Sequence, residues 1–114
     1  MDPGMERNRP ISEVAADALR LAGQAKARAH ASRKRAERIL DTCLLAVEGK
    51  SAEERKATAR LTPAYVKVDD EAVAAECEYI VAKADADAAM VEFEGYRTEE
   101  ATRREDRRFI GTMK

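Results

Sequence analysis

With 114 residues, 38% of them charged and only five aromatic, the chain is long enough for one domain but has few large side chains for a core. The near-neutral net charge of -1 excludes a wholly basic nucleic-acid binder, and the lack of an apolar run of about 18 residues excludes a membrane-spanning helix. We therefore expect a cytoplasmic protein that completes a thin core of alanine, valine, leucine and isoleucine by forming a homo-oligomer.

Residues 1–10 contain two prolines and a glycine and are predicted to form a disordered N-terminal tail, and residues 11–110 a single helical-hairpin domain. Ser12 is the expected N-cap of a first long helix that runs to about Val47 without a proline. Gly49 follows at a position that favours a left-handed C-terminal cap. Small and apolar residues recur along this helix in steps of three and four, with one extra step of four, as in a coiled-coil seam. They are Val14, Ala18, Leu21, Ala25, Ala29, Ser32, Ala36, Ile39, Cys43 and Ala46.

The connection begins with a capping-box signature, in which Ser51 and Glu54 satisfy free amides at the start of a helix. A short helix is therefore expected over residues 52–61. Two interpretations of Thr62-Pro63 remain open. The pair either interrupts the chain, because a residue before proline avoids helical angles, or it starts a new helix with Thr62 as the cap.

A second long helix is predicted with Asp69 and Asp70 as its cap and with its end near Arg108. It carries a second series with the same three-four spacing. The members are Val73, Cys77, Ile80, Ala84, Ala88, Val91 and Gly95. The predicted fold class is all-α, a long antiparallel helical hairpin resembling a coiled coil, with a short connecting helix.

One alignment of the two long helices follows if Val47 lies opposite Asp70, so that the numbers of facing residues add to about 117. Cys43 then lies near Cys77. A disulfide between them is conceivable, but two packed thiols are the favoured interpretation in a cytosolic chain.

Charge is strongly segregated along the chain. Residues 20–38 carry seven basic side chains and one acid, whereas residues 69–94 carry nine acids and one lysine. The alignment above places these stretches side by side. Pairing within the chain and a local basic surface that binds nucleic acid both explain the pattern, and both stay open.

The residues that carry enzyme chemistry are scarce. His30 is the only histidine, and one histidine with two distant cysteines cannot supply a four-ligand zinc site. No glycine-rich phosphate-binding loop is present. We predict a non-enzyme without a metal or a cofactor.

The best binding candidates are arginines interleaved with aromatic residues near the C-terminus, and the basic residues of the connection. Arginine pairs with phosphate through two hydrogen bonds, and aromatic rings stack on unpaired bases. The candidate nucleic-acid-binding residues are Lys50, Arg55, Lys56, Tyr96, Arg97, Arg103, Arg104, Arg107 and Arg108. The alternative is a solvated helix end held by ion pairs such as Glu99–Arg103 and Glu100–Arg104.

The motif Gly-Lys-Ser-Ala-Glu-Glu-Arg-Lys-Ala at 49–57 is followed by an acidic helix with Glu78-Tyr79, and by Phe-Glu-Gly-Tyr-Arg-Thr at 93–98 leading to Arg103-Arg104. This order resembles small bacteriophage proteins of DNA metabolism and, more loosely, the phage recombination mediator UvsY. Those proteins form ring-like helical oligomers, bind single-stranded DNA and help to load a recombinase over a single-strand-binding protein.

The resemblance implies a non-enzymatic phage accessory protein that binds single-stranded DNA in recombination or replication, in the host cytoplasm. A recombinase and a single-strand-binding protein are its implied partners. Two other functions remain open. One is a protein-binding adaptor or inhibitor that acts through the acidic helix, for example on a host defence protein. The other is a purely structural coiled-coil assembly element.

Overall fold

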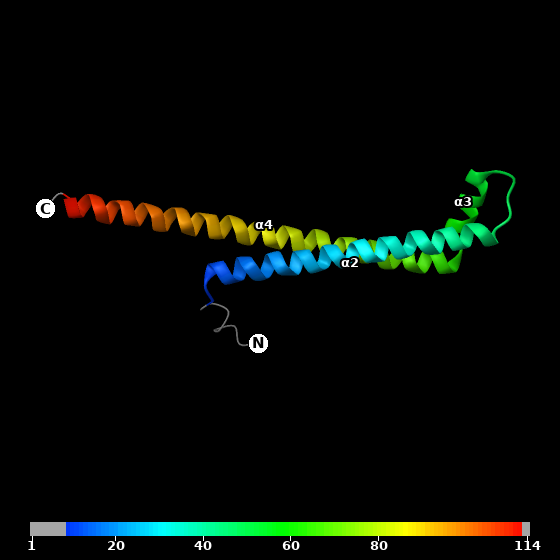
Figure 1. The fold of residues 1–114 in the computed structure, drawn as a ribbon, viewed down its shortest axis with the longest axis horizontal. Helices are drawn as coiled ribbons and strands as arrows, with labels where there is room; N and C mark the ends of the chain where they lie inside the picture. The colour runs from blue at the N-terminus through cyan, green and yellow to red at the C-terminus, as the bar shows by residue number, and fades with distance from the viewer. Residues whose placement is uncertain (1–8, 113–114) are drawn as a thin grey trace. The chain divides into compact units, whose positions relative to one another are not determined.

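The computed structural model describes residues 9–112, which contain three helices and no strand. They are α2 (Ile11–Ala46), α3 (Ala52–Arg60) and α4 (Pro63–Thr112). The predicted all-α helical hairpin is confirmed, since α2 packs along α4 and the short α3 lies in the connection (Figure 1). Residues 1–8 of the predicted tail lie outside the described residues. No helix in the described part of the chain combines the length and the apolar character needed to cross a membrane.

The start of α2 differs from the prediction by two residues. The carbonyl of Pro10 accepts hydrogen bonds from the amides of Glu13 and Val14, at 3.0 and 3.2 Å. Ser12 therefore lies inside the first turn and is not the cap. Proline fits just before a helix because it has no amide hydrogen that would need a partner.

The end of α2 is also different. None of the described glycines has a positive φ, so the expected left-handed cap at Gly49 is wrong. Gly49 instead lies against α3: a Cβ atom there would be 2.9 Å from Cγ of Arg55 and 3.3 Å from its amide nitrogen. A glycine is needed here because the chain passes close to the next helix.

The predicted capping box of α3 is confirmed. Ser51 Oγ accepts from the amide of Glu54 at 3.1 Å, and the Glu54 carboxylate accepts from the amide of Lys50 at 3.0 Å. The carboxylate thus reaches one residue further back than in the usual motif. These two bonds fix where the connection turns into α3.

The second interpretation of Thr62-Pro63 is the correct one. Pro63 is the first residue of α4, and the carbonyl of Thr62 accepts from the amide of Val66 at 3.0 Å. Proline is well suited to a first helical position. Asp69 and Asp70 consequently lie inside α4, so the prediction that they cap this helix is wrong.

Packing divides the chain into two compact units. The connector unit comprises residues 22–82, and its core consists of Ala36, Val68 and Ala72 with Ile39 and Tyr65 against it. The terminal unit combines α2 up to Leu21 with α4 from Lys83 onward, and it buries Ala15 and Ala86. In both units the buried residues are alanines apart from one valine, so the core is as thin as the composition indicates.

The face of α4 that packs on α2 is not the predicted one. One series of buried and half-buried residues runs along it in alternating steps of three and four without interruption. They are Tyr65, Val68, Ala72, Ala75, Tyr79, Ala82, Ala86, Ala89 and Phe93. Every member of the predicted series, from Val73 to Gly95, is exposed.

The seam of α2 was predicted more successfully. Ala25, Ala29 and Ala36 are buried as expected, but Val14 and Leu21 are exposed. The extra step of four is absent, since one series of buried and half-buried positions again runs in alternating steps of three and four. They are Ala15, Ala18, Ala22, Ala25, Ala29, Ser32, Ala36, Ile39 and Cys43.

The alignment of the helices in the connector unit is shifted by about ten residues from the predicted one. Arg33 contacts Asp69 and Glu76, and Cys43 contacts Thr62. The paired numbers therefore add to between 102 and 109 instead of about 117. The helices are antiparallel as predicted, but Cys43 does not lie near Cys77, and both thiols are free.

Candidate interaction surfaces

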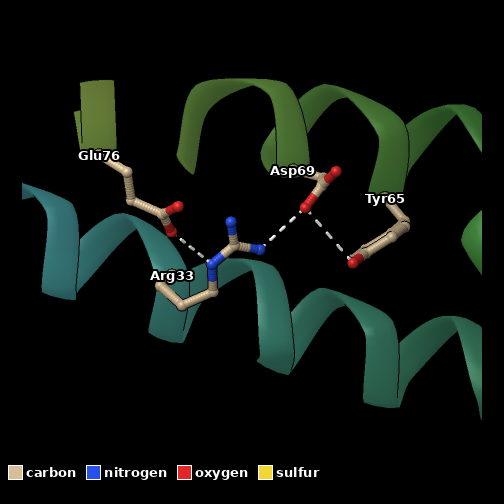
Figure 2. Close-up of polar contacts among 4 residues, drawn as sticks. All are labelled: Arg33, Tyr65, Asp69 and Glu76. Carbon is tan, nitrogen blue, oxygen red and sulfur yellow. Dashed lines mark hydrogen bonds and ion pairs between the residues drawn. The ribbon is translucent and has the colours of Figure 1, made fainter. Parts of the chain in front are cut away.

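Arg33 joins the two long helices of the connector unit. Its Nε donates to Glu76 Oε1 at 2.7 Å, and its Nη1 donates to Asp69 Oδ1 at 2.8 Å (Figure 2). Asp69 also accepts from the hydroxyl of Tyr65 at 3.5 Å. Asp69 and Glu76 are seven residues apart on one face of α4, so one guanidinium can reach both.

The hydrogen bond to Glu76, and then the bond to Asp69, raises the pKa of Arg33 further above its already high value. Arg33 is therefore a permanent positive charge between two acids. Its side chain is 35% exposed, so solvent screens the pairs only in part. The cluster is a cross-link between helices, in which Arg33 binds both acids and Tyr65 binds one of them.

The basic stretch of α2 is only partly neutralised within the chain. Besides Arg33, Arg35 lies 3.7 Å from Glu71, with 65% of its side chain exposed. Some of the other cationic side chains in this stretch make no hydrogen bond or ion pair with the described residues. They are Lys26, Arg28, Lys34 and Arg38. Intramolecular pairing therefore explains part of the charge segregation and leaves a basic surface on α2.

We call the side of α2 that points away from α4 in the connector unit the α2 outer face. It comprises Gly23, Ala27, Ala31, Lys34 and Arg38, all exposed. At 100° per residue these positions lie opposite the buried alanine seam. The face combines three very small residues with two cations, and between its first and last residue the only acid of α2 is Glu37.

We call the exposed series of α4 the α4 outer stripe. It comprises Val66, Val73, Cys77, Ile80, Ala84, Ala88, Val91 and Gly95. Val73, Ile80 and Val91 are 45%, 66% and 69% exposed. By helical geometry the stripe lies opposite the face that packs on α2. Acidic residues flank it on both sides, and those without a partner among the described residues include Asp70, Glu78, Asp87, Glu92 and Glu94.

The C-terminal part of α4, residues 94–111, is called the arm. Apart from the half-buried Glu100, every residue in it is exposed. Arg97 lies 5.8 Å from the ring centre of Phe93, and Arg103 pairs with Glu100 at 3.2 Å. A shallow, open groove runs along the arm between Glu94 and Glu105.

The remaining candidates of the arm point into solvent. Tyr96 is 44% exposed. Arg104, Arg107 and Arg108 have no hydrogen bond or ion pair with any described residue. The predicted pairs Glu99–Arg103 and Glu100–Arg104 are replaced by Glu100–Arg103, three residues apart. Three of the five arginines are therefore available to a ligand.

The candidates of the connection serve the local fold to different degrees. Arg55 donates to the carbonyl of Gly49 at 3.3 Å, so its side chain is part of the turn. Lys50 and Lys56 are exposed. These residues belong to the connector unit and the arm belongs to the terminal unit, so we treat them as separate surfaces.

Groups typical of a catalytic centre are few. In the described residues no three His, Cys, Asp or Glu side chains gather where they could hold a metal ion. His30 is exposed on α2. That the protein is not an enzyme stays a prediction. In comparisons with protein families, curated proteins and solved structures, the chain has no match.

Two of these surfaces were not predicted from the sequence. The α4 outer stripe was interpreted as the buried seam, and the α2 outer face was seen only as a run of charge. The signal for the α4 outer stripe was present, because α4 carries two series with steps of three and four on opposite faces. Only one of them can face α2, so the other had to be exposed.

Proposed function

We propose that this protein is a non-enzymatic adaptor that docks a helix of a partner protein on the α4 outer stripe. The observation that carries the proposal is the exposure of Val73 and Ile80 along one face of α4 in the connector unit, in line with the smaller Cys77 between them. Contiguous exposed apolar residues with a polar rim are typical of interaction sites. The three-four spacing matches the ridges and grooves of a helix.

The flanking acids restrict the partner. Asp70 and Glu78 lie beside the stripe, together with further acids along α4. A matching helix would present small or apolar residues in heptad spacing with lysine or arginine on both sides. A phage-encoded inhibitor of a host defence protein would be one adaptor of this kind.

A pair of labelled peptides tests this proposal. Both carry the same heptad of leucine and alanine, one with lysine flanks and the other with glutamate flanks. Fluorescence anisotropy should detect the basic peptide at micromolar to tens of micromolar protein and fail to detect the acidic one. Ile80→Glu should abolish binding, whereas Leu61→Glu, at an exposed aliphatic residue outside the stripe, should leave it unchanged. Equal binding of both peptides, or binding unaffected by Ile80→Glu, would contradict the proposal.

A second candidate is sequence-independent binding of single-stranded DNA by the arm, as in a recombination mediator that works with a recombinase and a single-strand-binding protein. Arg104, Arg107 and Arg108 favour it, because they have no partner among the described residues. Lys50 and Lys56 belong to the separate surface of the connection, where they would bind phosphate independently of the arm. The arm carries nearly equal numbers of acidic and basic residues, with glutamates between the arginines. This balance of charge argues against a high affinity for single-stranded DNA.

Anisotropy of labelled oligo-dT at about 50 mM salt tests this second candidate. Binding should weaken steeply with salt and should be lost in the triple variant Arg104→Ala, Arg107→Ala, Arg108→Ala. Arg103→Ala is the matched control, because this arginine is already paired with Glu100 and should matter less. A lack of binding at tens of micromolar protein would reject DNA binding.

A further inference from the structure

In the connector unit, small side chains of α4 are buried while larger aliphatic side chains are exposed to solvent. Its buried residues are alanines and Val68, while Val73 and Ile80 remain 45% and 66% exposed on the opposite face of α4. A helix that hides alanine and exposes isoleucine has not completed its core within one chain. The covering element must therefore come from outside these two helices.

The α2 outer face has the properties that such a covering element needs. Gly23 has nothing within 4 Å of the position that a Cβ atom would take, and Ala27 and Ala31 continue the same exposed face. Small residues at steps of four leave shallow hollows about 6 Å apart, into which branched side chains of another helix can insert. Among the described residues, none fills the space beside Gly23.

Charge decides which two faces meet. The α2 outer face carries Lys34 and Arg38, and the α4 outer stripe is flanked by acids, including Asp70 and Glu78 that lack a partner among the described residues. Pairing two α4 stripes would bring acids against acids, and pairing two α2 faces would bring cations together. Only the mixed pairing joins opposite charges.

We propose that the partner of the α4 outer stripe is a second copy of this chain, which docks its α2 outer face there, so that Val73 and Ile80 seat against Gly23, Ala27 and Ala31. This inference rests on the proposed docking role of the stripe. The contact is heterologous, because each copy uses two different faces. A docked pair still offers one free stripe on one copy and one free α2 face on the other, so assembly continues into a closed ring or an open chain.

Two single-face variants test the pairing. Ile80→Glu destroys the stripe and keeps the α2 face, whereas Ala27→Glu destroys the α2 face and keeps the stripe. By sedimentation velocity the wild type should exceed the 12.6 kDa monomer mass in a concentration-dependent way. Each variant alone should be monomeric, and an equimolar mixture should form a one-to-one dimer that grows no further. Formation of this dimer also shows that both variants are folded.

Other outcomes overturn the inference in distinguishable ways. If Ile80→Glu abolishes assembly but Ala27→Glu does not, the stripe pairs with itself and the mixed contact is wrong. If the wild type is a monomer at about 100 μM yet binds the basic peptide, the adaptor function is supported and docking of a second copy is rejected. If it is a monomer and binds neither peptide, both proposals fall.

Discussion

Replacing Arg33 with alanine removes both of its charge-assisted hydrogen bonds, at 2.7 Å to Glu76 and 2.8 Å to Asp69. An exposed pair contributes about 0.2–1 kcal/mol, and a fork-shaped guanidinium with two short bonds lies at the upper end of this range. Since the side chain is 35% exposed, full burial energies do not apply. We expect Arg33→Ala to lower the free energy of unfolding by about 1.5 kcal/mol and Tm by about 5–8 °C.

Urea and thermal unfolding, followed by circular dichroism at one fixed protein concentration, would measure this loss. Arg35→Ala is the matched control, because Arg35 makes a single contact of 3.7 Å to Glu71 with 65% of its side chain exposed. Its cost should stay below about 0.5 kcal/mol. A double-mutant cycle with Glu76→Gln should show coupling that shrinks in about 1 M salt. Equal costs for the two arginines, or zero coupling, would refute the assignment of Arg33 as the cross-link.

Four further outcomes are expected. Val68→Ala should cost about 2 kcal/mol in urea unfolding, because Val68 is 4% exposed and its methyl groups are lost from the core. Gly95→Ala should stabilise α4 by about 1 kcal/mol, since a Cβ there meets nothing within 4 Å. Gly49→Ala should destabilise, because its Cβ would lie 2.9 Å from a side-chain carbon of α3; the same sign for both glycines would contradict these contacts. The hydrogen bond and charge of Arg9 lower the pKa of Asp17 below 3.8, so its stabilising contribution persists above that pH and is lost as pH falls through the lowered value. Carbon-13 NMR titration should show this lowered pKa, and Arg9→Ala should restore the ordinary one.

The parts of the fold that were predictable from the sequence depend on local interactions. The capping box of Ser51 and Glu54 needs only four consecutive residues, and it is present. The length of α2 follows from the lack of a proline. The predicted cap at Asp69 is wrong because Pro63 had already started the helix about two turns earlier, and a carboxylate inside a helix has no free amide to accept from.

The choice of seam depends on long-range packing, which hydrophobicity alone does not determine. Val73 and Ile80 are more apolar than Ala72 and Ala75, so the series that contains them has the stronger apolar signal. The structure buries the alanines instead. Alanine on both helices allows their axes to approach closely, and the ion pairs of Arg33 then fix the alignment. This pairing becomes visible only when both helices are considered together.

The same limit applies to the candidate surfaces. The exposure of Arg104, Arg107 and Arg108 follows from their position beyond Phe93, the last half-buried residue of the α4 seam. Which arginine pairs with which acid does not follow, since pairs three and four residues apart have similar energies. The α4 outer stripe is recognisable as a surface only because the other three-four series of α4, from Tyr65 to Phe93, is the one that packs on α2.

A new cysteine at Thr62 tests the observed alignment of the helices directly. The hydroxyl of Thr62 lies 3.2 Å from Sγ of Cys43, so Thr62→Cys in a Cys77→Ser background places two sulfurs within reach of a bond. Mild oxidation should give an intramolecular disulfide, seen by mass spectrometry as the loss of two hydrogen atoms from a monomer. Closing a loop of about 20 residues should also raise the stability by up to about 3 kcal/mol. The control is the wild type, in which Cys77 is exposed and Cys43 is occupied by Thr62, so no intramolecular bond should form. A Cys43–Cys77 bond that forms readily within one chain would support the predicted alignment, in which the numbers of facing residues add to about 117. Val73 and Ile80 would then lie in the seam between the helices, and the docking surface would have no basis.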